Sequence, residues 1–205
     1  LGFISAGQKF GAEAYKRSES LNELAITGFS IFILILMFLP FSILSIFLAS
    51  NPELLLNKLS LTNRDIASNL LLIVATLLPV QIVLARATTF ILSIRLKDFI
   101  GLRVTILVNI LKISSVFVFF SEDEYMLTQY YLFVTLISIV GSIITLLIIK
   151  FKLNYDLLLL ISNIKYQKDV FDKIGKLAFS SFVLTISFVI YFQIRVTEGK
   201  LASFN

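Results

Sequence analysis

Long runs of apolar residues, interrupted by short charged segments, fill most of this chain. Each run reaches or exceeds about 18 residues, the length at which a bilayer-spanning helix becomes the expected structure. The alternation of apolar and polar residues that marks a membrane β-strand is absent, and a helix satisfies its own backbone groups in lipid. We therefore predict an all-α, polytopic transmembrane helix bundle with five full spans. The predicted spans are Leu24 to Ala49, Ile66 to Ile94, Phe99 to Phe120, Met126 to Ile149 and Leu177 to Ile194.

The composition agrees with a membrane protein and narrows its chemistry. The 205 residues are 58% hydrophobic, with a mean hydropathy of +0.94, whereas soluble domains contain about 45–50% apolar residues. The chain has no Cys and no His, which removes thiolate nucleophiles, imidazole bases and the commonest transition-metal ligands. We therefore expect no catalytic residue, no metal and no cofactor.

The distribution of basic residues predicts an orientation in the membrane. Of the 18 Lys and Arg residues, twelve fall in the connections of one side and four in those of the other. The richer side, which includes Lys9, Arg95 and Lys152, is predicted to be cytoplasmic, because cytoplasmic loops carry the excess of positive charge. This bias also accounts for the net charge of +5, so we expect no nucleic-acid partner.

The connection 154–173 is too poor in apolar residues to span a membrane. We predict an interfacial amphipathic helix along the cytoplasmic surface, with Lys165 and Lys168 available to lipid phosphates. A soluble cytoplasmic linker is the alternative. The apolar side of the predicted helix consists of Leu157, Leu160, Ile161 and Ile164.

A polar stripe runs along the third predicted span. Thr105, Asn109 and Lys112 follow at helical spacing, and Lys112 lies near the middle of the span, where snorkelling to the surface is difficult. The functional interpretation is a polar cavity wall that faces protein or water. The alternative is a Lys that only forms hydrogen bonds to neighbouring helices for packing.

Arg86 is the second basic residue inside a predicted span, about eight residues, or roughly 12 Å, from its cytoplasmic end. With Gln81 it is a candidate for lining a central cavity; alternatively, it snorkels toward the inner leaflet. Every Asp and Glu is predicted to lie in a loop or tail, so the two embedded cations favour an anionic cargo. A row of small residues on the fourth span is predicted to serve helix packing. The row contains Thr135, Ser138, Gly141, Ser142 and Thr145.

Three stretches of the chain carry a resemblance to a known family. They are GAEAYKRSESLNELAITGFSIF, PVQIVLARATTFILSIRLKDF and KDVFDKIGKLAFSSFVLTISFVIYFQI. With these stretches the chain resembles the Wzx-type polysaccharide or O-antigen flippases of the multidrug/oligosaccharidyl-lipid/polysaccharide (MOP) exporter superfamily. The resemblance implies a piece of a two-lobe transporter, and the first residues, LGFISAG, are typical of the end of a helix. By this reading 1–153 holds the spans of the N-terminal lobe, 154–173 is the connection, and 174–205 is the first helix of the C-terminal lobe with a tail.

The resemblance implies that the protein is a transporter and not an enzyme. A flippase of this type moves an undecaprenyl-diphosphate-linked oligosaccharide from the cytoplasmic to the periplasmic leaflet of the bacterial inner membrane by alternating access. The expected partners are the lipid-linked oligosaccharide, membrane lipids and other polysaccharide assembly proteins. Two other functions stay open, a multidrug or small-molecule exporter of the same superfamily and a membrane enzyme of polysaccharide assembly. The substrate-binding candidates are Gln81, Arg86, Thr105, Asn109 and Lys112.

Overall fold

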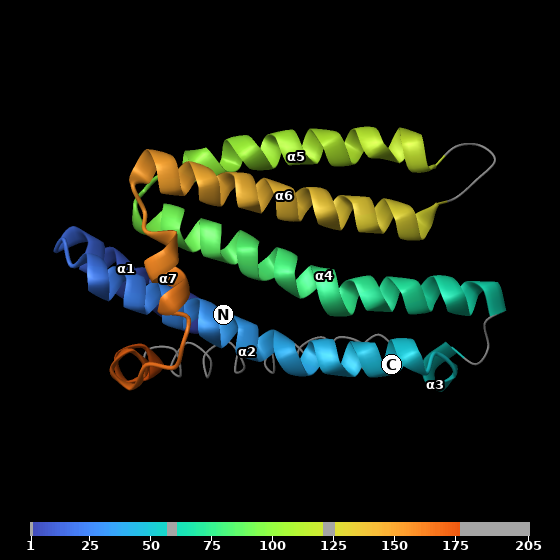
Figure 1. Ribbon diagram of the computed structural model, residues 1–205, viewed down its shortest axis with the longest axis horizontal. Coiled ribbons are helices and arrows are strands. Elements are labelled where there is room, and N and C mark those ends of the chain that lie inside the picture. The colour runs from blue at the N-terminus through green and yellow to red at the C-terminus, as the bar shows by residue number, and fades with distance from the viewer. Residues whose placement is uncertain (1, 57–60, 121–125, 177–205) are drawn as a thin grey trace, which may run out of the picture.

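The computed structural model of this chain describes residues 2–56, 61–120 and 126–176. Across these ranges the regular secondary structure is helical (Figure 1). Residues 168–176 form a further helical stretch at the end of the described chain. The labelled helices are α1 (Gly2–Lys16), α2 (Ser20–Ser50), α3 (Glu53–Leu56), α4 (Leu61–Ile94), α5 (Asp98–Phe119), α6 (Leu127–Leu153) and α7 (Leu157–Ser162).

Four of these helices, α2, α4, α5 and α6, are long and apolar enough to cross a membrane. They match the first four predicted spans, so the prediction of an all-helical, multi-pass membrane protein is confirmed for this part of the chain. The predicted fifth span, 177–194, lies outside the described residues, and so does most of the predicted unit 174–205.

The long helices lie side by side in the order α2, α4, α6 and α5, with α4 in the middle of the bundle (Figure 1). Helix α5 is at the edge of the bundle, and its main contacts are with α6 and α4. Its outer side exposes large apolar residues, such as Leu107, Ile113 and Phe117. In a lipid bilayer such a surface is stable without packing against protein, because the surrounding acyl chains are apolar as well.

The best-packed part of the molecule lies at one end of the bundle, where α1 and α7 contact the long helices. Phe29 of α2, Ile91 of α4 and Ile149 of α6 are fully buried there. Gly28 allows the backbone at Asn163 to lie directly against α2, because a Cβ atom at position 28 would overlap the Asn163 carbonyl group. This end carries the loops that are predicted to be cytoplasmic.

A tight turn joins α4 to α5 at the same end. The Lys97 amide donates to the Leu92 carbonyl oxygen (2.9 Å) and the Leu96 amide to that of Ser93 (3.2 Å). Leu96 has a φ of 55°, which completes a Schellman turn with leucine at the position that usually holds glycine. Helix α5 therefore begins at Asp98, immediately after α4, and runs back antiparallel to it (Figure 1).

The segment 154–173 differs from its prediction. Its only described regular helix before residue 168 is α7, which is six residues long and is capped by Asp156, whose carboxylate accepts from the Leu159 amide at 2.9 Å. Leu160 is buried, and Leu157 and Ile164 pack against the same core, whereas Ile161 is 62% exposed. The four apolar residues therefore do not form one exposed surface that could lie in the membrane interface. Three of them pack against the core, and α7 contacts α2.

Candidate functional site

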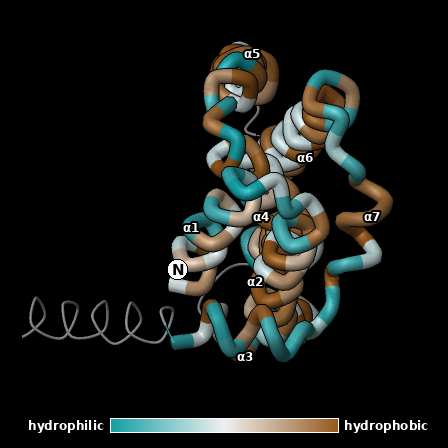
Figure 2. Tube along the Cα trace, turned by 90° about the vertical axis from the view of Figure 1, so that its left-hand side faces the viewer, coloured by the Kyte–Doolittle hydropathy of each residue, from teal (hydrophilic) through white to brown (hydrophobic). Residues whose placement is uncertain are grey.

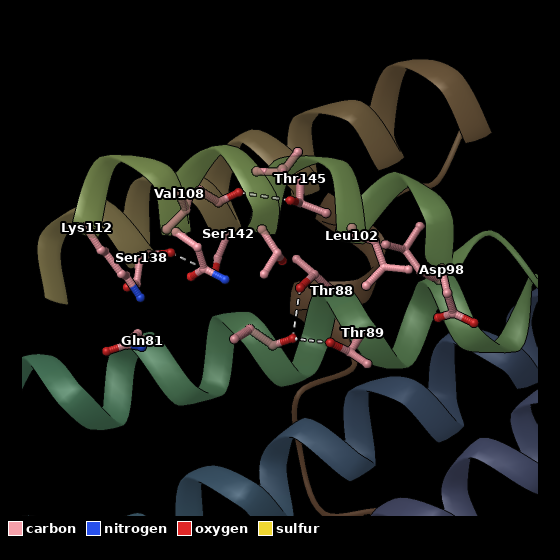
Figure 3. A pocket seen from close by; sticks show the side chains of 17 residues that line it. Gln81, Thr88, Thr89, Asp98, Leu102, Val108, Lys112, Ser138, Ser142 and Thr145 are labelled. Atoms are coloured by element: carbon pink, nitrogen blue, oxygen red, sulfur yellow. Dashed lines mark hydrogen bonds between the residues drawn. The ribbon is translucent and has the colours of Figure 1, made fainter. Parts of the chain in front are cut away.

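A groove of about 310 Å³ lies between α4, α5 and α6 (Figure 3). It is hydrophilic in an otherwise apolar part of the bundle, because each of the three helices turns polar side chains toward it. Four of the five predicted site residues line it, namely Gln81, Thr105, Asn109 and Lys112. The other polar residues of its wall are Thr88, Thr89, Asp98, Ser138, Ser142 and Thr145.

Lys112 and Gln81 face each other across one end of this groove, from α5 and α4 (Figure 3). Lys112 is half-buried, and no carboxylate among the described residues pairs with its ammonium group. It lies about 21 Å along α5 from Asp98, at 1.5 Å per residue. The stripe predicted on α5 therefore faces the space between three helices, and Lys112 lies seven residues, about 10 Å, from Phe119 at the other end of α5.

Five of the hydroxyl groups that line the groove donate their hydrogens to backbone carbonyl oxygens of their own helix. Ser138 donates to the Val134 carbonyl oxygen (2.6 Å), Ser142 to that of Ser138 (3.0 Å) and Thr145 to that of Gly141 (2.9 Å). On α4, Thr88 and Thr89 both donate to the Ala85 carbonyl oxygen at 2.8 Å. A ligand would therefore meet these hydroxyls as acceptors, and would find donors at Lys112, Asn109 and Gln81.

Asp98 lies at the opposite end of the groove from Lys112 (Figure 3). Its carboxylate accepts a hydrogen bond from the Ser93 hydroxyl at 2.7 Å, which joins the last turn of α4 to the first turn of α5. The sequence placed Asp98 in a short connection, and nothing in its spacing marked it as a groove residue. The groove thus has an acidic mouth at the well-packed end and a basic group, Lys112, at its opposite end.

Arg86 lies apart from the other four predicted residues. It contributes to a small depression toward α1 and α2, together with Ile4 and Ser30, and its side chain is exposed. Gln81 and Arg86 differ by five residues, which is about 140° beyond a full helical turn, so they cannot share one face of α4. In this bundle the groove contains one embedded cation and not two.

The row of small residues on α6 brings α5 close. A Cβ atom added to Gly141 would lie 2.5 Å from Cγ2 of Val108, so α5 could not stay at its present distance. Thr135 is buried and donates to the Tyr131 carbonyl oxygen. The predicted packing function of this row agrees with these contacts, although Ser138, Ser142 and Thr145 also form the groove wall.

A buried charged cluster at the well-packed end was missed in the sequence. Nε and Nη2 of Arg95 donate to the two carboxylate oxygens of Glu23, at 3.0 and 3.1 Å, and Nη1 donates to the Leu153 carbonyl oxygen at 3.1 Å. The rings of Tyr15 and Tyr155 lie 5.0 and 4.7 Å from the guanidinium carbon. The prediction that every acidic residue lies in a loop or tail is wrong, because Glu13, Asp65 and Asp98 lie in helices. Glu23 departs from it furthest, since it is in the first turn of α2 and is 1% exposed.

Tyr155 adds an unusual feature to this cluster. Its hydroxyl group is buried and has no hydrogen-bond partner among the described residues. The adjacent Thr27 gives its own hydroxyl hydrogen to the Glu23 carbonyl oxygen at 2.8 Å. Burial raises the pKa of Tyr155 well above its usual range and outweighs the Thr27 hydroxyl and the Arg95 charge, which act in the opposite direction; the Glu23 carboxylate also raises this pKa.

The described residues contain no group of three or more acidic side chains that could hold a metal ion, and the chain has neither His nor Cys. The groove can therefore bind through charge and hydrogen bonds, with Lys112 as its strongest donor. Comparison with protein-family models, with curated proteins and with solved structures finds no match to this chain.

Proposed function

We propose that this chain is part of a membrane transporter that moves a lipid-linked oligosaccharide across the bilayer, as the resemblance to Wzx-type flippases implies. The observation that carries the proposal is the groove with an unpaired Lys112 between three apolar helices. A Lys near the centre of a lipid-facing helix costs on the order of 2.5–3.5 kcal/mol on insertion scales. A polar groove that receives the ammonium group offsets this cost and offers an anion a binding partner.

The chemistry of the groove suits a sugar diphosphate. Lys112 provides a compact positive charge with three donors, which matches a phosphate oxygen, and Asn109 and Gln81 add amide donors. The hydroxyl oxygens of α6 accept from sugar hydroxyls. A volume of about 310 Å³ accommodates the phosphate and first sugar but not a whole oligosaccharide, so the remaining substrate and a polyprenyl chain would extend beyond it. The resemblance to Wzx-type flippases is the basis on which we also propose the bacterial inner membrane and a polysaccharide assembly pathway.

A small-molecule exporter of the same superfamily is the second candidate. It is favoured by the groove volume, because pockets for single small molecules are about 300–1,000 Å³. The two functions differ in what accumulates when the protein is absent. Loss of a flippase leaves lipid-linked intermediates on the cytoplasmic side, whereas loss of an exporter sensitises the cell to a diffusible compound.

The test uses the gene that encodes this chain in a strain from which it has been deleted. Surface polysaccharide and lipid-linked intermediates are measured for wild type, Lys112→Gln and Arg86→Gln. Each variant removes one cation from a predicted span, but only Lys112 lines the groove. We expect Lys112→Gln to lower surface polymer at least ten-fold, and Arg86→Gln to stay near the wild-type level at equal protein abundance.

Three outcomes distinguish the alternatives. Accumulated intermediates in the deletion strain, cleared by wild type but not by Lys112→Gln, support the flippase and its groove. If Lys112→Gln and Arg86→Gln lowered surface polymer equally, the groove would not be the site on which the function depends. A deletion strain with normal polymer but raised sensitivity to small molecules would reject the polysaccharide substrate and favour the exporter.

A further inference from the structure

A second pocket, of about 270 Å³, lies outside the groove, between the start of α5 and the end of α6. Three cations from different parts of the chain line it: Lys97 from the turn, Arg103 from α5 and Lys152 from α6. Its other lining residues are all apolar, so its wall contains no acidic side chain. The pocket is at the well-packed end of the bundle, at the ends of two spanning helices. Figure 2 looks onto this end and shows hydrophobic residues, in brown, along α5.

The three positive charges have no anionic partner in the described part of the chain. Lys97 and Arg103 both lie against the ring of Phe99, with Nζ at 6.0 Å and the guanidinium carbon at 5.5 Å from its centroid. The neighbouring Asp98 carboxylate is engaged by Ser93 and lines the groove instead. A formal charge of about three therefore converges on one concave surface, which favours an anion.

Two residues of the pocket wall are held in place by the packed core. Ile100 and Leu153 on its wall also pack against the buried core, and the Leu153 carbonyl oxygen is held by Arg95 at 3.1 Å. Lys97 is the N-cap of α5 and forms no capping hydrogen bond with its side chain.

We propose that this pocket binds the phosphate-bearing headgroup of an anionic phospholipid. Basic pockets between the ends of spanning helices lie at headgroup depth, where they attract anionic lipids. Phe99 is 49% exposed, and Ile106, which lies two helical turns further on the same side of α5, is 59% exposed. An acyl chain can lie along these residues while the three cations contact the phosphate. The proposal does not depend on what the groove transports.

The experiment uses the full chain, purified in a neutral detergent and titrated with short-chain phosphatidylglycerol, with bound lipid counted by native mass spectrometry. Phosphatidylcholine of the same chain length is the uncharged comparison. The pocket variant is Lys97→Gln/Arg103→Gln/Lys152→Gln. The matched control, Lys9→Gln/Lys16→Gln/Lys150→Gln, removes the same charge from exposed positions outside the pocket.

Each cation near a membrane surface contributes about five-fold in affinity for an anionic lipid, so the pocket variant should bind phosphatidylglycerol about 100-fold more weakly. The control variant should stay within a few-fold of wild type. If both triple variants lost the same affinity for phosphatidylglycerol, the binding would come from the net charge of the protein and the pocket would be rejected. Binding of phosphatidylcholine as tight as that of phosphatidylglycerol would also reject the pocket. Inorganic phosphate and glycerol 3-phosphate are titrated alone, and binding of either as tightly as the lipid would assign the pocket to a soluble phosphate and overturn the proposal.

Discussion

Glu23 and Arg95 are charged side chains that the fold withdraws from solvent, with exposed fractions of 2% and 16%. Removing one member of such a pair leaves the other charge buried without a partner, which typically costs about 3–5 kcal/mol. We therefore expect Arg95→Met to lower the free energy of unfolding by about 3 kcal/mol. The measurement is unfolding by increasing sodium dodecyl sulfate in mixed micelles, followed by circular dichroism.

A double-mutant cycle separates the pair from other losses at these positions. Arg95 also donates to the Leu153 carbonyl oxygen and contacts two tyrosine rings, so part of its effect persists without Glu23. We expect Glu23→Gln/Arg95→Met to be less destabilised than the sum of the single variants by at least about 1 kcal/mol. Additive costs would contradict a direct ion pair.

Tyr155 is expected to tolerate loss of its hydroxyl group, because that group is buried without a hydrogen-bond partner in the described chain. Tyr155→Phe keeps the ring beside Arg95 and removes an unsatisfied polar atom, so its stability should equal or exceed that of wild type. Tyr155→Ala, which empties the site, should cost about 3 kcal/mol. A Tyr155→Phe variant as unstable as Tyr155→Ala would show that the hydroxyl is paired.

The same residue predicts a response to alkaline pH. The pKa of Tyr155 is raised in the folded chain, so the unfolded chain releases this proton first, near its ordinary pKa of about 10. The stabilisation is complete below that pH and decreases above it. Unfolding measured between pH 9 and pH 11 should show a smaller loss of stability in Tyr155→Phe than in wild type.

At the scale of helices, the contact between α5 and α6 determines the shape of the groove. The missing side chain of Gly141 gives Val108 its place, so Gly141→Ala should separate the two helices and cost about 1–3 kcal/mol. Gly175→Ala is the matched control, since its added Cβ atom would make only ordinary contacts, at 3.8 Å, with Phe171. Unfolding in mixed micelles compares the two variants, and equal stability would contradict the close approach.

The hydrophobic pattern predicted the four described spans well, because in lipid the length of an apolar run decides whether a helix forms. The short helices were harder to predict. Helix α7 is defined by a cap at Asp156 and by packing of Leu160 on the core, and neither is visible as a periodic run. Likewise α1 is an amphipathic helix whose apolar residues do not form a run long enough to predict a span, and it packs against α2 and α4.

At the scale of the whole molecule, the candidate groove was only partly predictable. The polar stripe of α5 was visible because its residues share one helix and one period. That Gln81 of α4 lies opposite Lys112, and that Arg86 does not, depends on how α4 is rotated against its neighbours. The Glu23–Arg95 pair joins residues 72 positions apart, so a single sequence gives no spacing from which to infer it.

The orientation of the bundle is the property on which both proposed sites depend. The chain has no Cys, so one introduced cysteine reports one position without background. Glu53 of α3 and Lys168 are both exposed; Glu53 follows the last turn of α2, and Lys168 follows α7 at the well-packed end.

In spheroplasts, a membrane-impermeant maleimide should label Glu53→Cys directly and Lys168→Cys only after permeabilisation, because the basic connections are retained in the cytoplasm. This result would place the Asp98 mouth of the groove and the basic pocket in the inner leaflet, where a lipid-linked substrate and anionic phospholipids are both present. The reverse labelling would put the mouth on the outside and require an importer or a different use of the groove. Labelling of both positions in intact spheroplasts would contradict a spanning α2 altogether.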